Sequence, residues 1–194
     1  MNLVFLPATA PEDQRYGTMP ERLEGFPDVT VGHVRFPHVV WYNKTIREQT
    51  LQQIDALPFS PIVLVGFSKS GLGAWNIARA IPKRVEATII FDAPVSREKL
   101  PPWGTAPFYA DHEAWLTDLP MRQVADFKAA VLARHRLVLI SGVGFHGEMV
   151  TFSQALYQAG VEHTFLPRPQ LKHHWSSGWI EEGLEVLRQE RTNL

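Results

Sequence analysis

A serine stands in a short turn between an apolar segment and a helical pattern. The apolar segment is 62–65, and the letters GFSKSG occupy positions 66–71. A serine at a sharp strand-to-helix turn has a strained backbone and a hydroxyl held out above the sheet. Small residues on both sides of Ser68 make so tight a turn possible. We therefore predict that Ser68 is a nucleophile and that the Lys69 N–H, at the helix start, faces the oxyanion.

The same turn has two simpler interpretations, a flexible loop without chemistry and a phosphate cradle at a helix N-terminus. A P-loop has a longer glycine-rich segment that ends in Gly-Lys followed directly by Ser or Thr. The sequence contains no such segment. The nucleophile is therefore the favoured interpretation.

A serine hydroxyl is a weak nucleophile at neutral pH, so it needs an imidazole to remove its proton and a carboxylate to orient that imidazole. Two neighbouring histidines, His173 and His174, lie near the C-terminal end of the sequence. Two carboxylates are candidates for the acid. Asp92 follows a predicted strand at the edge where such sheets gather ligand-contacting groups, so we favour it over Glu148. Asp92 can instead cap a turn, and Glu148 can simply stabilise a helix start.

These groups belong to a chain in which short apolar runs alternate with amphipathic stretches. That alternation predicts an α/β fold with a parallel sheet covered on both faces by helices. We expect strands at 2–6, at 29–31 or 39–42, and at 62–65, 87–91, 137–140 and 161–166. We expect helices at 45–57, from the Ser68 turn to before Pro82, and at 121–134, 148–158 and 177–188.

The turn around Ser68 resembles the G-x-S-x-G nucleophile elbow of the α/β-hydrolase superfamily, with Ser70 at the second glycine and Gly71 one residue later. Positions 173–179 resemble the superfamily's His-x-Trp-x-x-Gly-Trp ending. The resemblance covers nearly the whole chain and implies a minimal α/β-hydrolase fold of about six strands, similar to the smallest lipases and cutinase-like esterases. It also implies the order Ser, acid, His, with His173 as the base and His174 as the alternative base.

In the commonest superfamily pattern the acid follows the strand that corresponds to 137–140. Phe145 occupies that position here, and a phenyl ring cannot orient an imidazole. Asp92 resembles the acid of pancreatic-type lipases, and Glu148 is the alternative acid. The resemblance places the second oxyanion donor in the loop after the first strand, where Pro7 has no N–H; Ala8 is then the first choice and Thr9 the next.

Segment 95–120 interrupts the alternation as a long irregular insertion. It contains several prolines and four large aromatic side chains: Trp103, Phe108, Tyr109 and Trp115. One hypothesis makes it a rigid cap whose aromatic side chains wall an apolar acyl pocket. The other makes those side chains the anchoring core of the loop itself. The sequence favours neither.

Composition limits the other functional classes. A chain of 194 residues with 45% hydrophobic content is expected to form one domain over 1–194. A net charge of −1 without charged blocks indicates no nucleic-acid or acidic-lipid partner. The absence of cysteine excludes disulfides and cysteine-based zinc sites. Histidines near 112, 146 and 173 lack familiar metal-ligand spacing, so we expect no metal and no cofactor.

The N-terminal apolar stretch is too short for a signal peptide or a membrane span, so we expect a cytoplasmic protein. The sequence predicts a serine hydrolase that cleaves a small ester, thioester or related acyl substrate through Ser68, His173 and Asp92. A peptidase or an acyltransferase with the same triad stays open. The alternative hypothesis is a catalytically impaired binding or interaction module, motivated by Phe145 and the altered elbow glycine.

Overall fold

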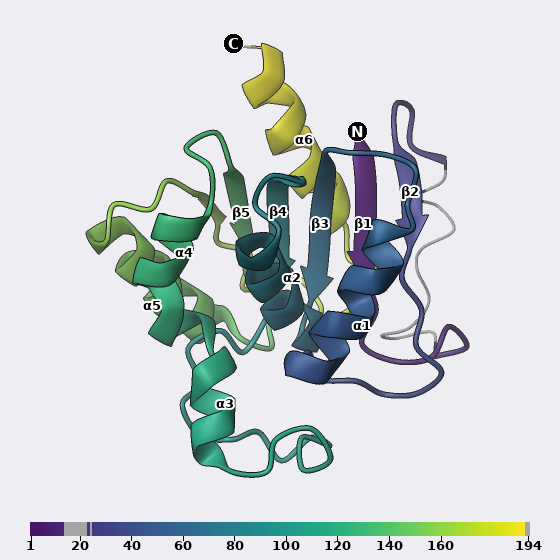
Figure 1. The fold of residues 1–194 in the computed structure, drawn as a ribbon. Coiled ribbons are helices and arrows are strands. Elements are labelled where there is room, and N and C mark those ends of the chain that lie inside the picture. Colours follow the sequence, from purple (N-terminus) through teal and green to yellow (C-terminus); the bar gives the residue numbers. More distant parts are fainter. Residues whose placement is uncertain (14–22, 24, 193–194) are drawn as a thin grey trace.

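A computed structural model describes residues 1–13, 23 and 25–192. Within these residues six parallel strands form one sheet in the order β2-β1-β3-β4-β5-β6 (Figure 1). The strands are β1 Asn2–Leu6, β2 Thr30–His33, β3 Ile62–Phe67, β4 Val85–Phe91, β5 Arg136–Ile140 and β6 Thr164–Leu166. The prediction of a parallel α/β sheet is thus confirmed. The second strand is the one expected near 29–31, whereas Val40, Trp41 and Tyr42 form a buried loop.

Six α-helices lie in the described part of the chain. They are α1 Lys44–Asp55, α2 Lys69–Ala80, α3 His112–Asp118, α4 Val124–Ala130, α5 His146–Gln158 and α6 Trp179–Thr192. Side-chain capping defines the start of α1, because Asn43 accepts a hydrogen bond from the N–H of Ile46. The helix predicted at 121–134 is shorter than expected: a 3-10 turn, Pro120–Gln123, precedes α4.

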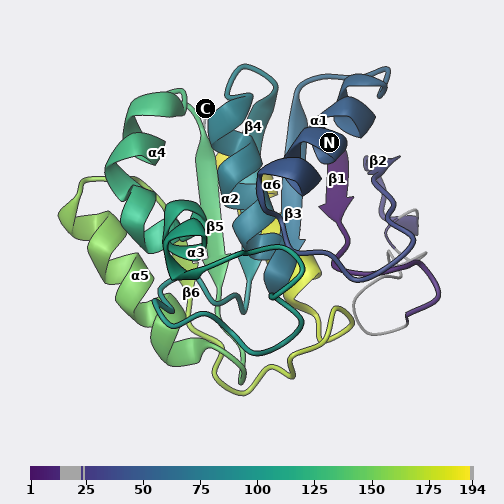
Figure 2. The ribbon, with the colours of Figure 1, turned by 60° about the horizontal axis from the view of Figure 1, so that its bottom comes forward.

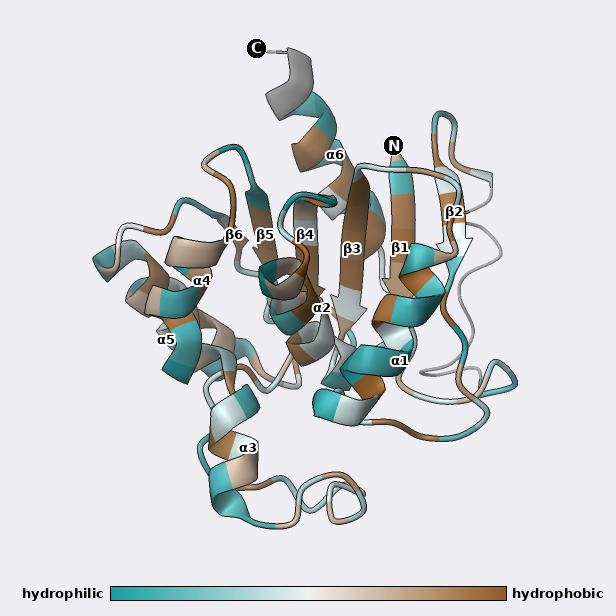
Figure 3. Cartoon of the chain, viewed as in Figure 1, coloured by the Kyte–Doolittle hydropathy of each residue, from teal (hydrophilic) through white to brown (hydrophobic). Residues whose placement is uncertain are grey.

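Alternation along the strands divides the core into two parts. Leu3 and Phe5 of β1 face the side covered by α6, and Val4 and Leu6 face the side of α1, α2 and α5. Figures 1 and 2 show α6 alone behind the sheet and α1, α2, α4 and α5 in front of it, while α3 lies below the sheet in Figure 1. The central strands are mostly hydrophobic, β2 at the edge is mixed, and the outer faces of the helices are mixed or hydrophilic (Figure 3). A sheet covered on both faces requires this pattern.

The larger core part is centred on Trp75 of α2. Its ring is fully buried and stacks on Phe127 of α4, with 3.7 Å between ring centroids. Phe152 of α5 contacts the same ring edge-on at 5.1 Å. One side chain therefore joins three helices over the centre of the sheet.

The parallel arrangement brings the carboxyl ends of all the strands to one edge. Ser68 follows β3, Asp92 follows β4, and the loop before α6 starts beyond β6. Figure 2 shows segment 95–111 crossing this edge. No helix of the described residues is long and apolar enough to cross a membrane. Any site assembled from strand ends must lie at this edge.

We predict that Trp75→Ala lowers the free energy of unfolding by about 3–5 kcal/mol, because the surrounding rings cannot close the cavity. Urea denaturation followed by circular dichroism measures the change. Tyr157→Ala is the matched aromatic control on the surface, since Tyr157 is 81% exposed, and it should change stability by less than about 0.5 kcal/mol. Equal effects of the two substitutions would contradict the central place of Trp75.

Candidate functional site

Ser68 lies at the junction of β3 and α2 with a backbone that few non-glycine residues adopt. Its φ is 56° and its ψ is −121°, values outside the common regions for L-residues. The turn is tight enough that a Cβ at Gly66 would lie 2.5 Å from the carbonyl oxygen of Ser70. A side chain at Gly66 would therefore force the strand away from the helix start.

Ser70 takes the place of the second elbow glycine and is almost fully buried. Its hydroxyl accepts a hydrogen bond from the N–H of Phe67 at 2.9 Å and donates one to the Phe67 carbonyl at 3.0 Å. The extra hydroxymethyl group is therefore accommodated, and it also ties the end of β3 to the first turn of α2.

Three side chains predicted from the sequence meet at the carboxyl edge of the sheet. His173 Nε2 lies 3.2 Å from the hydroxyl oxygen of Ser68, and His173 Nδ1 lies 2.6 Å from Oδ2 of Asp92. Ser68 is 6% exposed and Asp92 is 0% exposed. The arrangement is a continuous hydrogen-bonded chain from a buried carboxylate through an imidazole to a hydroxyl.

Asp92 is held by the loop that follows β5. Oδ1 accepts hydrogen bonds from the N–H groups of Gly142, at 2.9 Å, and of Phe145, at 2.7 Å. Oδ2 accepts one from the N–H of Gly144 at 2.9 Å, in addition to the bond with His173. Each carboxylate oxygen thus has two donors, which compensates the loss of water around a buried charge.

Phe145 occupies the position at which the commonest superfamily pattern has its acid. Its backbone N–H holds Asp92, and its ring contacts His173 with centroids 5.5 Å apart. The loop after β5 therefore supports an acid from the neighbouring strand. A Cβ at Gly144 would lie only 2.7 Å from His173 Nδ1, so this position must stay free of a side chain.

The His173 ring is held between aromatic groups as well. Phe67, next to Ser68, lies with its centroid 4.7 Å from the imidazole, in addition to the contact with Phe145. His174, the alternative base, has its Nδ1 2.6 Å from the hydroxyl of Ser176. The structure thus brings His173, and not His174, to Ser68.

Glu148, the alternative acid, lies in the first turn of α5 and pairs with Arg97. Arg97 Nε and Nη2 lie 2.8 and 2.5 Å from Oε1 of Glu148. Burial raises the pKa of Glu148, and Arg97 partly offsets the effect. Glu148 therefore joins segment 95–120 to α5 rather than contacting His173.

The loop after β1 lies beside the Ser68 turn because β1 and β3 are neighbours. Leu6 is in register with Gly66, so Ala8 and Ser68 each follow two residues later. Ala8 is 2% exposed, and its carbonyl accepts a hydrogen bond from Val40 at 2.9 Å. Lys69 places its backbone at the start of α2. The two predicted oxyanion donors thus belong to segments that border the same serine.

The Lys69 side chain is half-buried beside Trp41. Its Nζ lies 5.5 Å from the centre of that ring, a cation–π arrangement. Burial lowers the pKa of Lys69, and the charge of Asp13 opposes the shift. The carboxyl edge therefore carries a partly desolvated cation close to Ser68 in the chain.

The aromatic side chains of segment 95–120 divide between the two predicted roles. Tyr109 and Trp115 are buried and pack edge-on against Trp41, with centroids 6.5 and 5.6 Å from it. Trp103 is 45% exposed and contacts the ring of Phe145 at 5.8 Å. Tyr109 and Trp115 anchor the segment, whereas Trp103 stays partly exposed beside the buried ring of Phe145, with the Arg97 guanidinium over both rings.

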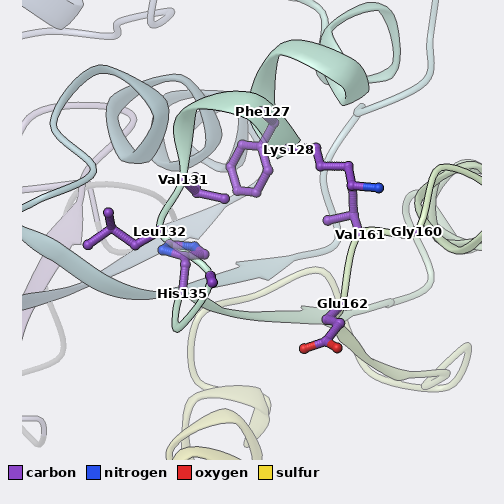
Figure 4. A pocket seen from close by; sticks show the side chains of 9 residues that line it. Phe127, Lys128, Val131, Leu132, His135, Gly160, Val161 and Glu162 are labelled. Carbon is purple, nitrogen blue, oxygen red and sulfur yellow. The ribbon is translucent and has the colours of Figure 1, made fainter.

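A cavity of about 340 Å³ lies near the start of β5, at the end of the sheet away from Ser68 (Figure 4). His135 lines it, and the ring nitrogens of His135 lie 3.2 Å from the Thr88 hydroxyl and 3.3 Å from the Val85 carbonyl. Burial lowers the pKa of His135. We therefore interpret it as a neutral structural histidine. Among the described residues no group of three or more potential ligands is arranged to hold a metal ion.

Sequence reasoning missed the backbone donors of the loop after β5. Main-chain N–H groups have no residue signature, although glycines at 142 and 144 mark a loop that lets the chain approach another group. It also missed the role of the 40–42 segment, which contacts the loop after β1 through Val40 and Tyr42.

Comparison with known proteins places the arrangement in context. No family model and no curated protein sequence matches the chain. The S-formylglutathione hydrolase of Staphylococcus aureus superposes with a TM-score of 0.66 at 14% identity, covering 95% of this chain and 82% of the other. A lipase-esterase related protein of Clostridium acetobutylicum gives 0.62 at 12% identity, covering 95% and 93%.

The dipeptidyl peptidase 4 of Porphyromonas gingivalis gives a TM-score of 0.64 at 12% identity, covering 96% of this chain and 31% of the peptidase. These superpositions show a shared fold. At sequence identities of 12–14% they do not extend to the chemistry, which depends on the residues of this chain.

We predict that Ser70→Ala lowers the free energy of unfolding by about 1–3 kcal/mol, because the N–H of Phe67 loses its acceptor in a buried turn. Thermal and urea denaturation measure the loss. Thr151→Ala, which removes an exposed hydroxyl on α5, should change stability by no more than about 0.5 kcal/mol. A Ser70 variant as stable as the Thr151 variant would show that the hydroxyl does not tie the turn.

Proposed function

The chain has the α/β-hydrolase fold, and on that premise we propose that it is a serine hydrolase of small ester, thioester or related acyl substrates. The observation that carries the proposal is the hydrogen-bonded chain Asp92–His173–Ser68, with distances of 2.6 and 3.2 Å. We propose further that residues 1–194 form one domain and that segment 95–120 acts as its cap.

In the proposed reaction the Ser68 oxygen attacks the acyl carbon while His173 Nε2 takes the hydroxyl proton. Asp92 keeps the Nδ1 proton of His173 on the far side of the ring and stabilises the imidazolium that forms. The N–H groups of Lys69 and Ala8 stabilise the oxyanion of the tetrahedral intermediate. His173 then returns the proton to the leaving group, and an acyl-enzyme remains. Water attacks this ester while His173 takes a proton from it, and the proton passes to the Ser68 oxygen as the acid product leaves.

The partly exposed ring of Trp103, which contacts Phe145, supports an acyl or alkyl substrate. Phe145 in turn contacts His173, so an apolar group bound against Trp103 would be separated from the imidazole by one ring. A peptidase would use the same residues to release an amine, and an acyltransferase would pass the acyl group to an acceptor other than water. The described contacts do not distinguish these reactions from ester hydrolysis.

The alternative hypothesis, a catalytically impaired binding or interaction module, has less support than the hydrolase. It depended on the missing carboxylate at Phe145, but Asp92 lies within hydrogen-bond distance of His173 with each oxygen also held by the backbone. A base oriented in this way supports activation of Ser68.

We predict that a fluorophosphonate probe labels Ser68 covalently, because the activated hydroxyl attacks phosphorus as it would an acyl carbon. Mass spectrometry of the digested protein identifies the modified residue. Ser68→Ala should abolish labelling, and Ser176→Ala, which removes an exposed hydroxyl of the histidine loop, should keep it. Absence of labelling under conditions that label a control esterase would refute the proposed function.

We predict that Asp92→Asn lowers kcat for p-nitrophenyl acetate by on the order of 10³–10⁴, because His173 would lose the partner that sets its tautomer. Glu148→Gln should retain activity within about threefold, since Glu148 contacts Arg97 and not His173. Circular dichroism checks that both variants fold. An active Asp92 variant together with an inactive Glu148 variant would reverse the assignment of the acid.

A further inference from the structure

We propose that Tyr42 is a positioning residue of the site: its hydroxyl holds the Pro7 carbonyl and so aims the Ala8 N–H at the oxyanion. This inference rests on the proposed function. It assigns a role to a buried side chain that precedes α1 and that belongs to none of the segments of the predicted triad.

The argument starts from one peptide group. The Tyr42 hydroxyl donates a hydrogen bond to the Pro7 carbonyl at 2.7 Å, and Tyr42 is fully buried. The Pro7 carbonyl and the Ala8 N–H belong to the same peptide plane, which is trans, so they point in opposite directions. Fixing the carbonyl on the Tyr42 side therefore fixes the N–H on the other side.

A second contact fixes the next peptide plane. The N–H of Val40 donates to the Ala8 carbonyl at 2.9 Å. Ala8 thus has both adjoining peptide groups held from the segment 40–42. No hydrogen bond from the Ala8 N–H to another described residue is found, and Ala8 is only 2% exposed. A buried N–H held in direction and left without an acceptor is suited to bind a transient oxyanion.

The Tyr42 ring is also seated against the helix that supplies the other donor. A Cβ at Gly73 of α2 would lie 2.4 Å from atoms of this ring, so the ring lies directly on the helix backbone. Phe36 packs edge-on against it with centroids 6.2 Å apart. The same side chain therefore contacts the loop of Ala8 and the helix that begins at Lys69 and keeps the two donors at a constant separation.

The protonation state suits this role. Burial raises the pKa of Tyr42 well above its usual value, which keeps the hydroxyl a donor throughout the range in which a histidine base works. The ring contacts Phe36 and Gly73 and its hydroxyl contacts the Pro7 carbonyl, and none of these groups titrates; the Arg47 guanidinium contacts the Tyr42 carbonyl instead.

The test is Tyr42→Phe, which removes the hydroxyl and keeps the ring. We expect kcat for p-nitrophenyl acetate, per titrated active site, to fall about 10- to 100-fold with KM changed less than about twofold, because loss of one whole oxyanion donor costs about 10²–10³. The inhibition constant of phenylboronic acid, whose serine adduct places an oxygen at the oxyanion position, should rise by a similar factor. Thermal denaturation and circular dichroism accompany both measurements.

Thr50→Val is the matched control. Thr50 is also fully buried, and its hydroxyl donates to a backbone carbonyl, that of Ile46, at 2.7 Å within α1. It should lose stability to a similar extent and keep kcat per site within about twofold. A Tyr42 variant that loses only stability or titratable sites, with kcat per site and boronate inhibition unchanged, would overturn the inference. A wild-type protein that neither reacts with the fluorophosphonate nor cleaves the ester would instead refute the proposed function.

Discussion

A carboxylate removed from water needs a hydrogen-bond donor for each of its oxygens, and the candidate site is built around that requirement at Asp92. The three N–H groups of the loop after β5 and the imidazole of His173 supply these donors. The course of that loop, the glycine at 144 and the orientation of His173 all follow from satisfying one buried charge. Because an unpaired buried carboxylate is costly, this geometry belongs to the folded state and needs no ligand to form.

The same loop explains how a carboxylate that follows β4 can be held beside His173. The ends of β4 and β5 are neighbours in the sheet, with Phe91 in register with Ile140. A carboxylate after either strand can therefore reach the same imidazole, and the loop without the acid can support it through main-chain donors. Because Asp92 supplies the carboxylate, position 145 can carry an aromatic ring, which contacts both His173 and Trp103.

Rigidity around Ser68 comes from several small tethers. The Ser70 hydroxyl joins the end of β3 to α2, the Tyr42 hydroxyl joins the loop after β1 to the segment before α1, and Arg97 joins segment 95–120 to α5. Of these contacts, we expect the Tyr42 hydrogen bond to affect the rate of the proposed reaction, because it orients an oxyanion donor.

The order of strands and helices, the turn at Ser68 and the proximity of Asp92 and His173 to it could be predicted from the sequence. Apolar runs, small residues at a bend and the order along the chain that the superfamily resemblance implies were sufficient for this. The identity of the second strand and the short helix after Pro120 could not be predicted, because packing decides whether a segment such as 39–42 extends a sheet or fills a core.

Only the tertiary structure decided that Glu148 pairs with Arg97, that His174 contacts Ser176, and that backbone groups near Phe145 hold Asp92. The contacts of Glu148 and Asp92 join residues 50 or more positions apart, and those of Asp92 use main-chain N–H groups that every residue type except proline carries, so neither leaves a signature in the order of amino acids. The contact of His174 with Ser176 is local, but the course of the loop decides which of the two neighbouring histidines reaches Ser68.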